Sequence, residues 1–342
     1  FQAEDGIRDS STSRGLGDVY KRQISDDWPT QNIGEIAMDW NNGILWVGTG
    51  ENNSSRSSYS GIGILKTNAD GSNWENVGLH DSHHIGKILI NPENSNHVVI
   101  GVTGHLYSKN INRGVYVTKD GGKNWNRTLY VNDVSGIIDM SETPGDFNVM
   151  YATSWEKDRK AWNFDEDGHS SGIYKSIDGG NKLFKTHDSY LDGVYNTYGY
   201  YFFKIHVDPN NSEKIYTYGV PILSSDDGGK TFVQLKERNK HSDNHVIVFK
   251  KNDPDYLMIG TDAGIYESYD IAETWRYVKN LPLTQFYKVA VNNAEPFYHI
   301  FGGTQYNGSA GGPSDTPIQS VHHPQQNPGS TYQRLGLPQR SS

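Results

Sequence analysis

The sequence predicts an all-β protein of the β-propeller class, and three observations lead to that prediction. A turn pattern, Ser/Thr-x-Asp-x-Gly-x-x-aromatic, recurs five times along the 342 residues. Its Asp position falls at residues 69, 120, 178, 227 and 270, a spacing that suits one four-stranded blade per repeat. The composition, with 37 glycines, 22 tyrosines and 8 tryptophans, fits tight turns and pleated, half-buried strands. About six four-stranded blades are visible in part, which leaves both a complete and an incomplete ring open.

The two ends of the chain depart from this pattern. Residues 1–23, FQAEDGIRDSSTSRGLGDVYKRQ, show neither strand nor helix periodicity and resemble the translated read-through of a sequencing adapter. We expect a non-native, disordered segment there; an ordinary loose N-terminal arm is the alternative. Residues 317–342 are rich in Pro, Gln and Ser, which predicts a disordered or frameshifted tail. The propeller is accordingly expected at residues 24–316, as a piece of a longer protein.

The repeated turn has a physical explanation that requires no catalytic role. The Asp carboxylate is placed to accept backbone N–H groups across the turn, the Gly permits a positive φ, and the aromatic ring packs between neighbouring sheets. The copies depart from the pattern at Ala69, Leu183 and Ala272. The residues assigned to this turn structure are Thr118, Asp120, Gly122, Trp125, Ser176, Asp178, Gly180, Ser225, Asp227, Gly229, Phe232, Ser268, Asp270 and Trp275.

A strand–turn–strand element alternates with these turns. Apolar and polar residues alternate in Lys87–Ile90 and Lys204–Val207, which is a strand signal. Asn91-Pro92, Asp208-Pro209 and Asp253-Pro254 interrupt the runs as turns do. Each blade is therefore predicted to run as inner strand, Pro turn, second strand, third strand, repeated turn and outer strand.

Several stretches together resemble a known family. WVGTGENNSSRS, VGLHDSHHIGKILINPENSN, GVYVTKDGGKNW and FGGTQYNGSAGGPSDT are similar to bacterial secreted Asp-box (BNR-repeat) β-propellers of the sortilin N-terminal domain or glycosyl hydrolase-like group. The resemblance extends over most of the region between the two aberrant ends. It implies a secreted or periplasmic propeller within a longer parent that carries further propeller or C-terminal domains. It implies no settled activity.

The loops that follow predicted second strands are the first places to look for a site. Glu51 and Asn52 follow the strand Leu45–Val47. Glu51 is a candidate general acid and Asn52 a candidate ligand contact, with a hydrogen-bonded Asx-type loop as the alternative. His83 and His84 lead into an inner strand. His84 is another candidate ligand contact, and for both histidines a capping or stacking role is the alternative to ligation.

Two further segments offer ligand contacts. An insert lengthens the second repeat, and its Trp155, Arg159 and Trp162 are candidates for a platform on which a sugar or peptide side chain stacks. Gln305 and Asn307 lie in a polar loop at the same relative position as Glu51 and are also candidate ligand contacts.

A segment rich in His and Asp precedes another predicted inner strand. Strand alternation would place His241, Asp243 and His245 on one face, where two imidazoles and a carboxylate can bind a divalent metal or act as an acid–base pair. Polar channel-lining residues bonded to backbone or water are the alternative. Asp243 and Asp262, together with Glu51, are also the candidate catalytic carboxylates.

Charge and composition exclude several classes of function. The net charge of -9 and the pI of about 5.8 argue against nucleic acid as a partner, because phosphate binding needs a basic face. A mean hydropathy of -0.71 without a long apolar run argues against a membrane span. No cysteine is present for disulfide or thiol chemistry. The Phe/Tyr-Arg-Ile-Pro motif of a sialidase is missing.

Two functions remain open from the sequence. The first is an extracellular or periplasmic propeller that binds peptide or glycan ligands on its channel face. The second is a glycoside hydrolase, not a typical sialidase, that uses two carboxylates across the channel. A divalent metal is the one cofactor that the residues suggest.

Overall fold

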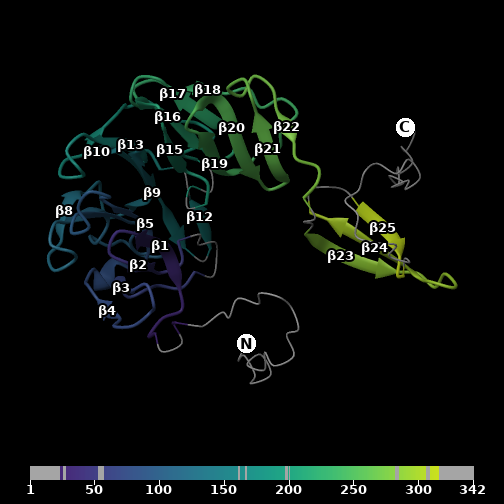
Figure 1. Ribbon diagram of the computed structural model, residues 1–342, viewed down its shortest axis with the longest axis horizontal. Helices are drawn as coiled ribbons and strands as arrows, with labels where there is room; N and C mark the ends of the chain where they lie inside the picture. Colours follow the sequence, from purple (N-terminus) through teal and green to yellow (C-terminus); the bar gives the residue numbers. More distant parts are fainter. Residues whose placement is uncertain are drawn as a thin grey trace. The chain divides into compact units, whose positions relative to one another are not determined.

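The computed structural model describes residues 24–25, 28–52, 58–160, 162–165, 168–196, 199, 201–281, 285–305 and 309–315. The segments 1–23 and 317–342, for which a non-native segment and a tail were predicted, lie outside these residues. Figure 1 shows a chain made of strands and their connecting loops. Contacts within the chain divide it into two compact units. The first comprises the described residues of Phe1–Met140, Ser154–Ser171 and Ser176–Phe184, and the second those of Ser141–Thr153, Gly172–Lys175 and Lys185–Ser342.

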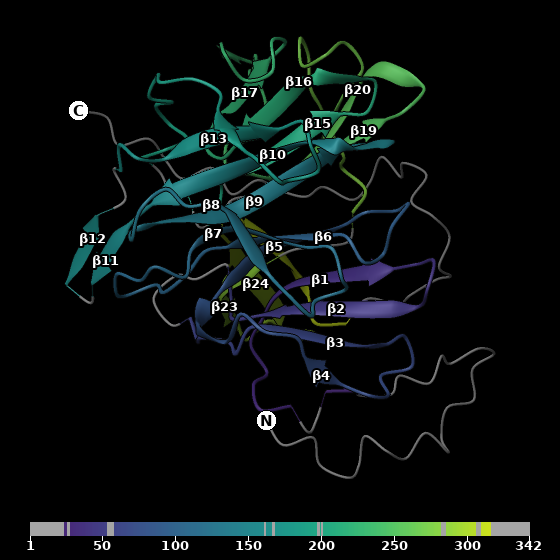
Figure 2. The same cartoon turned by 90° about the vertical axis from the view of Figure 1, so that its left-hand side faces the viewer.

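The first unit contains two antiparallel four-stranded sheets in which the strands follow in sequence order. The first sheet, drawn in Figure 2, is β1 (Ile33–Asp39), β2 (Ile44–Thr49), β3 (Ile64–Asn68) and β4 (Glu75–Asn76). The second is β5 (Ile85–Ile90), β6 (Val98–Val102), β7 (Gly114–Thr118) and β8 (Asn126–Leu129). The inner strands β1 and β5 are in contact, as inner strands of successive propeller blades are.

A third four-stranded sheet contributes strands to both units. Its order is β14 (Phe184–Lys185), β13 (Gly172–Ser176), β10 (Asp146–Glu156) and β9 (Ser135–Thr143). The segment between β10 and β13 carries a separate antiparallel pair, β11 (Asp158–Lys160) and β12 (Asn163–Asp165). The insertion predicted from the long second repeat is therefore a short hairpin.

The second unit continues the same pattern with two more four-stranded sheets. One is β15 (Lys204–Asp208), β16 (Asn211–Tyr218), β17 (Ile222–Ser225) and β18 (Val233–Gln234). The other is β19 (Asn244–Lys250), β20 (Asp253–Thr261), β21 (Gly264–Ser268) and β22 (Arg276–Tyr277). The predicted turn at Asp253-Pro254 is instead the start of β20, a position at which the ladder tolerates a proline.

The last sheet has three strands and little cover. It consists of β23 (Phe286–Val291), β24 (His299–Thr304) and β25 (Ser309–Pro313). Every residue of β23 is exposed, although four of its six side chains are large and apolar. This sheet therefore has both faces open among the residues that the structure describes.

Apolar middle strands form the core between sheets. All five residues of β6 are buried, and Val98 and Ile100 join Trp46 and Ile64 of the preceding sheet in one cluster. In the second unit, Tyr216 and Ile222 of one sheet pack with Ile259 and Tyr266 of the next. No helix of the described residues is long and apolar enough to cross a membrane.

The repeated turns show the hydrogen bonds that their sequence suggests. Thr118 Oγ1 donates to Asp120 Oδ1 at 2.7 Å, and Gly122 N–H donates to Thr118 Oγ1 at 3.0 Å. In the four Asp-containing copies, the N–H four residues after the Asp donates to its carboxylate at 2.9 Å. Trp125 Nε1 donates to the Val77 carbonyl of the neighbouring sheet at 2.7 Å. The turn thus closes its own loop and also ties two sheets together.

Two copies show what the departures from the pattern do. Ile271 and Ala272 stand where other copies have glycines, and both keep a positive φ, 51° and 65°. In the first copy Ala69 replaces the Asp, and the next residue, Asp70, accepts the Ser72 N–H at 2.9 Å instead. The turn is therefore kept in both copies. Loss of the glycines leads to backbone strain, and loss of the Asp leads to a shorter hydrogen-bonded loop.

Candidate functional site

In these antiparallel sheets, several loops emerge along one edge. The segment after β2, the segment before β5 and the segment after β6 all leave the first two sheets on that side, which we call the loop edge. Backbone hydrogen bonds link them: Gly61 N–H donates to the His83 carbonyl at 2.7 Å, and Thr103 N–H to the His84 carbonyl at 2.9 Å. Side chains from three separate segments therefore gather at one place.

Two predicted ligand contacts at the loop edge are buried and bind the backbone instead. Asn52 Nδ2 donates to the Ile138 carbonyl at 3.3 Å, and Asn52 Oδ1 accepts from Thr103 Oγ1 at 3.1 Å. His84 is 2% exposed and hydrogen-bonds the backbone of Glu51, and burial lowers the pKa of His84 to about 3. The alternative of a hydrogen-bonded loop therefore describes Asn52, and His84 is a neutral packing residue. Glu51 itself is half-buried beside them.

The predicted stacking platform is not assembled. Trp155 is 1% exposed, because strand β10 extends through Glu156 and turns this ring into the core. Trp162 is 85% exposed in the loop between β11 and β12. The backbone of Arg159 pairs with Phe164, and its side chain lies outside the described part. The two tryptophans therefore do not present one surface.

A cluster of three polar side chains lies on the loop edge of the first unit. Asp81 and His83 come from the segment before β5, and His105 from the segment after β6. The Nε2 atoms of His105 and His83 lie 3.3 Å and 3.7 Å from Asp81 Oδ1. The two imidazoles stack, with ring centroids 3.4 Å apart and planes 13° from parallel. Among the described residues this is the one group of three whose ligand atoms lie close enough to share a metal ion.

Neighbouring groups hold this cluster in place. Asn112 Nδ2 donates a hydrogen bond to Asp81 Oδ2 at 2.7 Å. This hydrogen bond lowers the pKa of Asp81, and the hydrogen bond with His105 lowers it to a smaller extent. The pKa of His83 is also lowered, first by burial and then by the neighbouring His105. Ser108 Oγ lies 3.0 Å from His105 Nδ1. The cluster is thus polar and partly exposed, and Asn112 and Ser108 hold two of its members in place.

Arg113 fixes the loop that carries His105. It is 1% exposed, and its guanidinium donates to the carbonyls of Thr103, His105 and Ser108 at 2.7, 2.5 and 3.0 Å. Burial lowers the pKa of Arg113 to about 10. A buried guanidinium thus replaces the regular backbone ladder in this loop.

The predicted triad of the second unit is not brought together. The backbone at Asp243 has φ 64°, so alternation begins only after it, and His241 and His245 do not share a face with it. His241 Nδ1 instead lies 2.8 Å from the Ser242 carbonyl. Since the three side chains do not meet as ligands, the metal-binding hypothesis has no geometric support at this place.

His245 has a different partner. Its Nε2 atom lies 2.5 Å from Asp262 Oδ1, which joins the start of β19 to the end of β20. Tyr201 approaches His245 edge-on at a centroid distance of 5.0 Å, and Phe202 lies at 5.1 Å. Tyr201 is 40% exposed, whereas Phe202 is buried below it. We call Tyr201, His245 and Asp262 the aromatic shelf.

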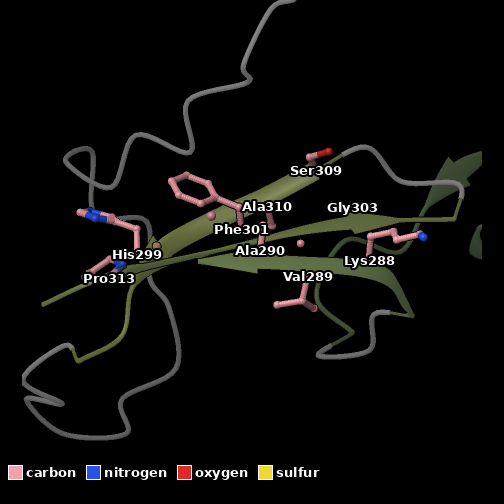
Figure 3. A pocket seen from close by; sticks show the side chains of 12 residues that line it. Lys288, Val289, Ala290, His299, Phe301, Gly303, Ser309, Ala310 and Pro313 are labelled. Atoms are coloured by element: carbon pink, nitrogen blue, oxygen red, sulfur yellow. The ribbon is translucent and has the colours of Figure 1, made fainter. Parts of the chain in front are cut away.

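The loop after β24 adds little to a site. Gln305 is exposed, and Asn307 lies outside the described residues. A hollow of about 630 Å³ on the same sheet is lined by Lys288, Val289, His299 and Phe301, among others (Figure 3). Its walls come from one three-stranded sheet, and glycines form much of its floor. We regard it as the uncovered face of a sheet, because few polar groups converge on it.

Comparisons with known proteins agree on the fold. No protein-family model and no curated protein matches the chain. Three solved GH74 enzymes are similar in structure: a GH74 xyloglucanase from Xanthomonas campestris (TM-score 0.56, 14% identity), a GH74 enzyme from Niastella koreensis (0.55, 17%) and an ancestral GH74 enzyme (0.55, 15%). The matches cover 79%, 79% and 82% of this chain but only 42%, 42% and 36% of those chains. The chain is thus a β-propeller protein that spans less than half the length of these neighbours.

The sequence contained a signal for this cluster, although only His83 of its three members was named as a candidate. Asp81 and His83 directly precede an inner strand, and His105 follows a second strand, which are the loop positions expected to carry a site. What the sequence did not reveal is that these two loops are adjacent. Tyr201 also precedes an inner strand, but nothing in the sequence indicates that its ring meets His245.

Proposed function

We propose that this chain is a recognition propeller whose aromatic shelf binds a glycan or a peptide. The observation that carries the proposal is Tyr201, held edge-on to an imidazole that is paired with a carboxylate. An exposed aromatic ring offers an apolar face for the C–H groups of a sugar or for an apolar side chain. The adjacent Asp262 carboxylate accepts hydrogen bonds from hydroxyl or amide groups of a ligand, and the His245 ring donates or accepts them.

Recognition is favoured over glycoside hydrolysis by the state of the candidate carboxylates. Hydrolysis needs one carboxyl group to donate a proton and a second to act as base or nucleophile. Asp262 is instead held by His245, and Asp243 accepts a hydrogen bond from Ser242 Oγ at 3.3 Å. The GH74 neighbours support the fold, and a fold does not determine an activity. We further propose a location outside the cytoplasm, on the sequence resemblance to secreted propellers.

The test is a binding screen with matched variants. The protein is applied to glycan and peptide arrays, and the affinity for any retained ligand is compared with that of Tyr201→Ala and Asp262→Asn. Loss of one stacking ring is expected to weaken binding roughly 3- to 10-fold. Tyr269→Ala is the control, because Tyr269 is another exposed tyrosine of the same unit and lies in a repeated turn away from His245.

Two outcomes would overturn the proposal. Equal loss of affinity in Tyr201→Ala and Tyr269→Ala would show that the shelf is not the binding place. Release of shortened glycan, detected by mass spectrometry and abolished by Asp262→Asn or Glu51→Gln, would make the chain a hydrolase.

A further inference from the structure

We propose that Asp81, His83 and His105 form a binding site for a divalent transition metal ion of the zinc type. The site is separate from the aromatic shelf, and the proposal stands whether or not the shelf binds a ligand. It rests on the meeting of two histidines and one aspartate from two loops at the loop edge of the first unit.

The separations between the ligand atoms suit a shared ion. Zinc lies about 2.0–2.2 Å from imidazole nitrogen and carboxylate oxygen, so two of its ligands in tetrahedral arrangement are about 3.4 Å apart. The distances from Asp81 Oδ1 to the His105 and His83 Nε2 atoms are 3.3 and 3.7 Å. All three ligand atoms lie within 4.8 Å of one another. Little movement of these atoms is needed to reach the distances of a metal centre.

One adjustment is required in ring orientation. Metal ions bind imidazole nitrogen in the plane of the ring, and two rings that stack 13° from parallel point their lone pairs side by side. For both to bind one ion, one ring must rotate about its Cβ–Cγ bond. His83 is the ring with more freedom, because the Nδ1 atom of His105 is already placed by Ser108 Oγ. We therefore expect metal binding to separate the stacked rings.

The surrounding residues resemble those that support known metal ligands. A ligating histidine commonly hydrogen-bonds through its second nitrogen, and a ligating carboxylate through its second oxygen. Ser108 hydrogen-bonds the second nitrogen of His105, and Asn112 hydrogen-bonds the second carboxylate oxygen of Asp81. Arg113 holds the carbonyls of His105 and Ser108, so the loop that presents the second imidazole is fixed before any ion arrives.

Backbone strain at the same place gives independent support. His83 has φ 56° and ψ -48°, and Leu79, two residues before Asp81, has φ 57°. Non-glycine residues with positive φ are uncommon and cost about 1–2 kcal/mol each. Such conformations cluster at binding sites, where they aim particular side chains. Here they turn His83 back toward Asp81.

The donor set indicates the class of ion. Two imidazole nitrogens and one carboxylate oxygen suit zinc, iron, cobalt, nickel or copper, whereas calcium and magnesium prefer oxygen ligands alone. Three protein ligands leave positions for water or a ligand group. The site is therefore open, like metal sites that bind or activate a small molecule.

The experiment measures zinc binding by the untagged chain. Equilibrium dialysis and calorimetry with Zn²⁺ are applied to the wild type and to Asp81→Asn, His83→Gln and His105→Gln. Visible absorption of the Co²⁺ form reports nitrogen coordination independently. His80→Gln is the matched control, because His80 is an exposed histidine of the same segment outside the cluster. Far-ultraviolet circular dichroism checks that each variant is folded.

We expect one Zn²⁺ per chain in the wild type and in His80→Gln. Affinity should fall by about tenfold or more in each of the three cluster variants. His245→Gln should bind Zn²⁺ as the wild type does. The proposal is overturned if the folded wild type binds no Zn²⁺, or if binding survives in His105→Gln and is lost in His245→Gln. Tyr201→Ala should leave Zn²⁺ binding unchanged, so failure of the shelf and failure of the metal site are distinguishable.

Discussion

Replacing Arg113 with methionine tests whether a buried guanidinium holds the His105 loop. Methionine keeps much of the length of the side chain but removes every donor. The carbonyls of Thr103, His105 and Ser108 would each lose a partner. A buried polar group left without a hydrogen bond costs about 1–3 kcal/mol. Three such groups would cost about 3–9 kcal/mol if none were solvated.

Two effects make the expected loss of stability smaller than this sum. Water can enter the space left by the shorter polar head and satisfy part of the loss. Burial of the guanidinium, which lowers the pKa of Arg113, also carries a desolvation cost that methionine avoids. We therefore expect Arg113→Met to lower the free energy of unfolding by about 3 kcal/mol, and to weaken zinc binding because His105 is no longer fixed.

Urea unfolding followed by tryptophan fluorescence measures the loss. Arg127→Met is the matched control: Arg127 is exposed, donates to the single carbonyl of Ile111 and lies over the ring of Tyr130. Arg127→Met should lower the free energy of unfolding by less than about 1 kcal/mol. The reasoning is refuted if Arg113→Met lowers the free energy of unfolding no more than Arg127→Met does.

Three further predictions concern the rest of the fold. Ile271→Gly should raise the free energy of unfolding by up to about 1 kcal/mol, since it relieves a β-branched residue at φ 51°; an unchanged or lower urea midpoint would contradict this. Burial lowers the pKa of His187 in the folded state below 6.5, so its contribution to stability is complete above pH 6.5 and is lost as the pH falls from there through the lower folded-state pKa; the difference in free energy of unfolding between wild type and His187→Gln, measured by urea unfolding at pH 7.5 and 5, should be smaller at pH 5. Trp155→Ala should lower the free energy of unfolding by about 3–5 kcal/mol, whereas Trp162→Ala should change it by less than about 0.5 kcal/mol. Equal shifts of the melting temperature in the two variants would contradict the placement of Trp155 in the core.

Local sequence features predicted the fold well because they act over short distances. The repeated turn is closed by a hydroxyl and a carboxylate two residues apart, so its hydrogen bonds hardly depend on the rest of the chain. The strand runs and turns between its copies set the number of strands per blade in the same way. The turn at Asp253-Pro254 was misplaced because a proline at the start of a strand and a proline in a turn look alike in sequence.

Side-chain exposure was harder to predict than strand order. Trp155 was expected to face a ligand, but strand β10 extends through Glu156 and its ring is buried in the core. His241, Asp243 and His245 were expected on one face, and a single residue in the left-handed region at Asp243 removed the alternation on which that expectation depended. Both errors concern residues at or beside the end of a strand.

The sequence by itself determined the β-propeller class, the blade repeat and the structural role of the Asp turns, because each depends on residues close together in the chain. Only the tertiary structure decided which side chains meet. Asp81 and His105 are 24 residues apart, and Tyr201 lies in the loop before β15 whereas His245 lies in β19. The physical reason is that antiparallel sheets return distant loops to one edge, and the packing between neighbouring sheets then fixes which of these loops touch.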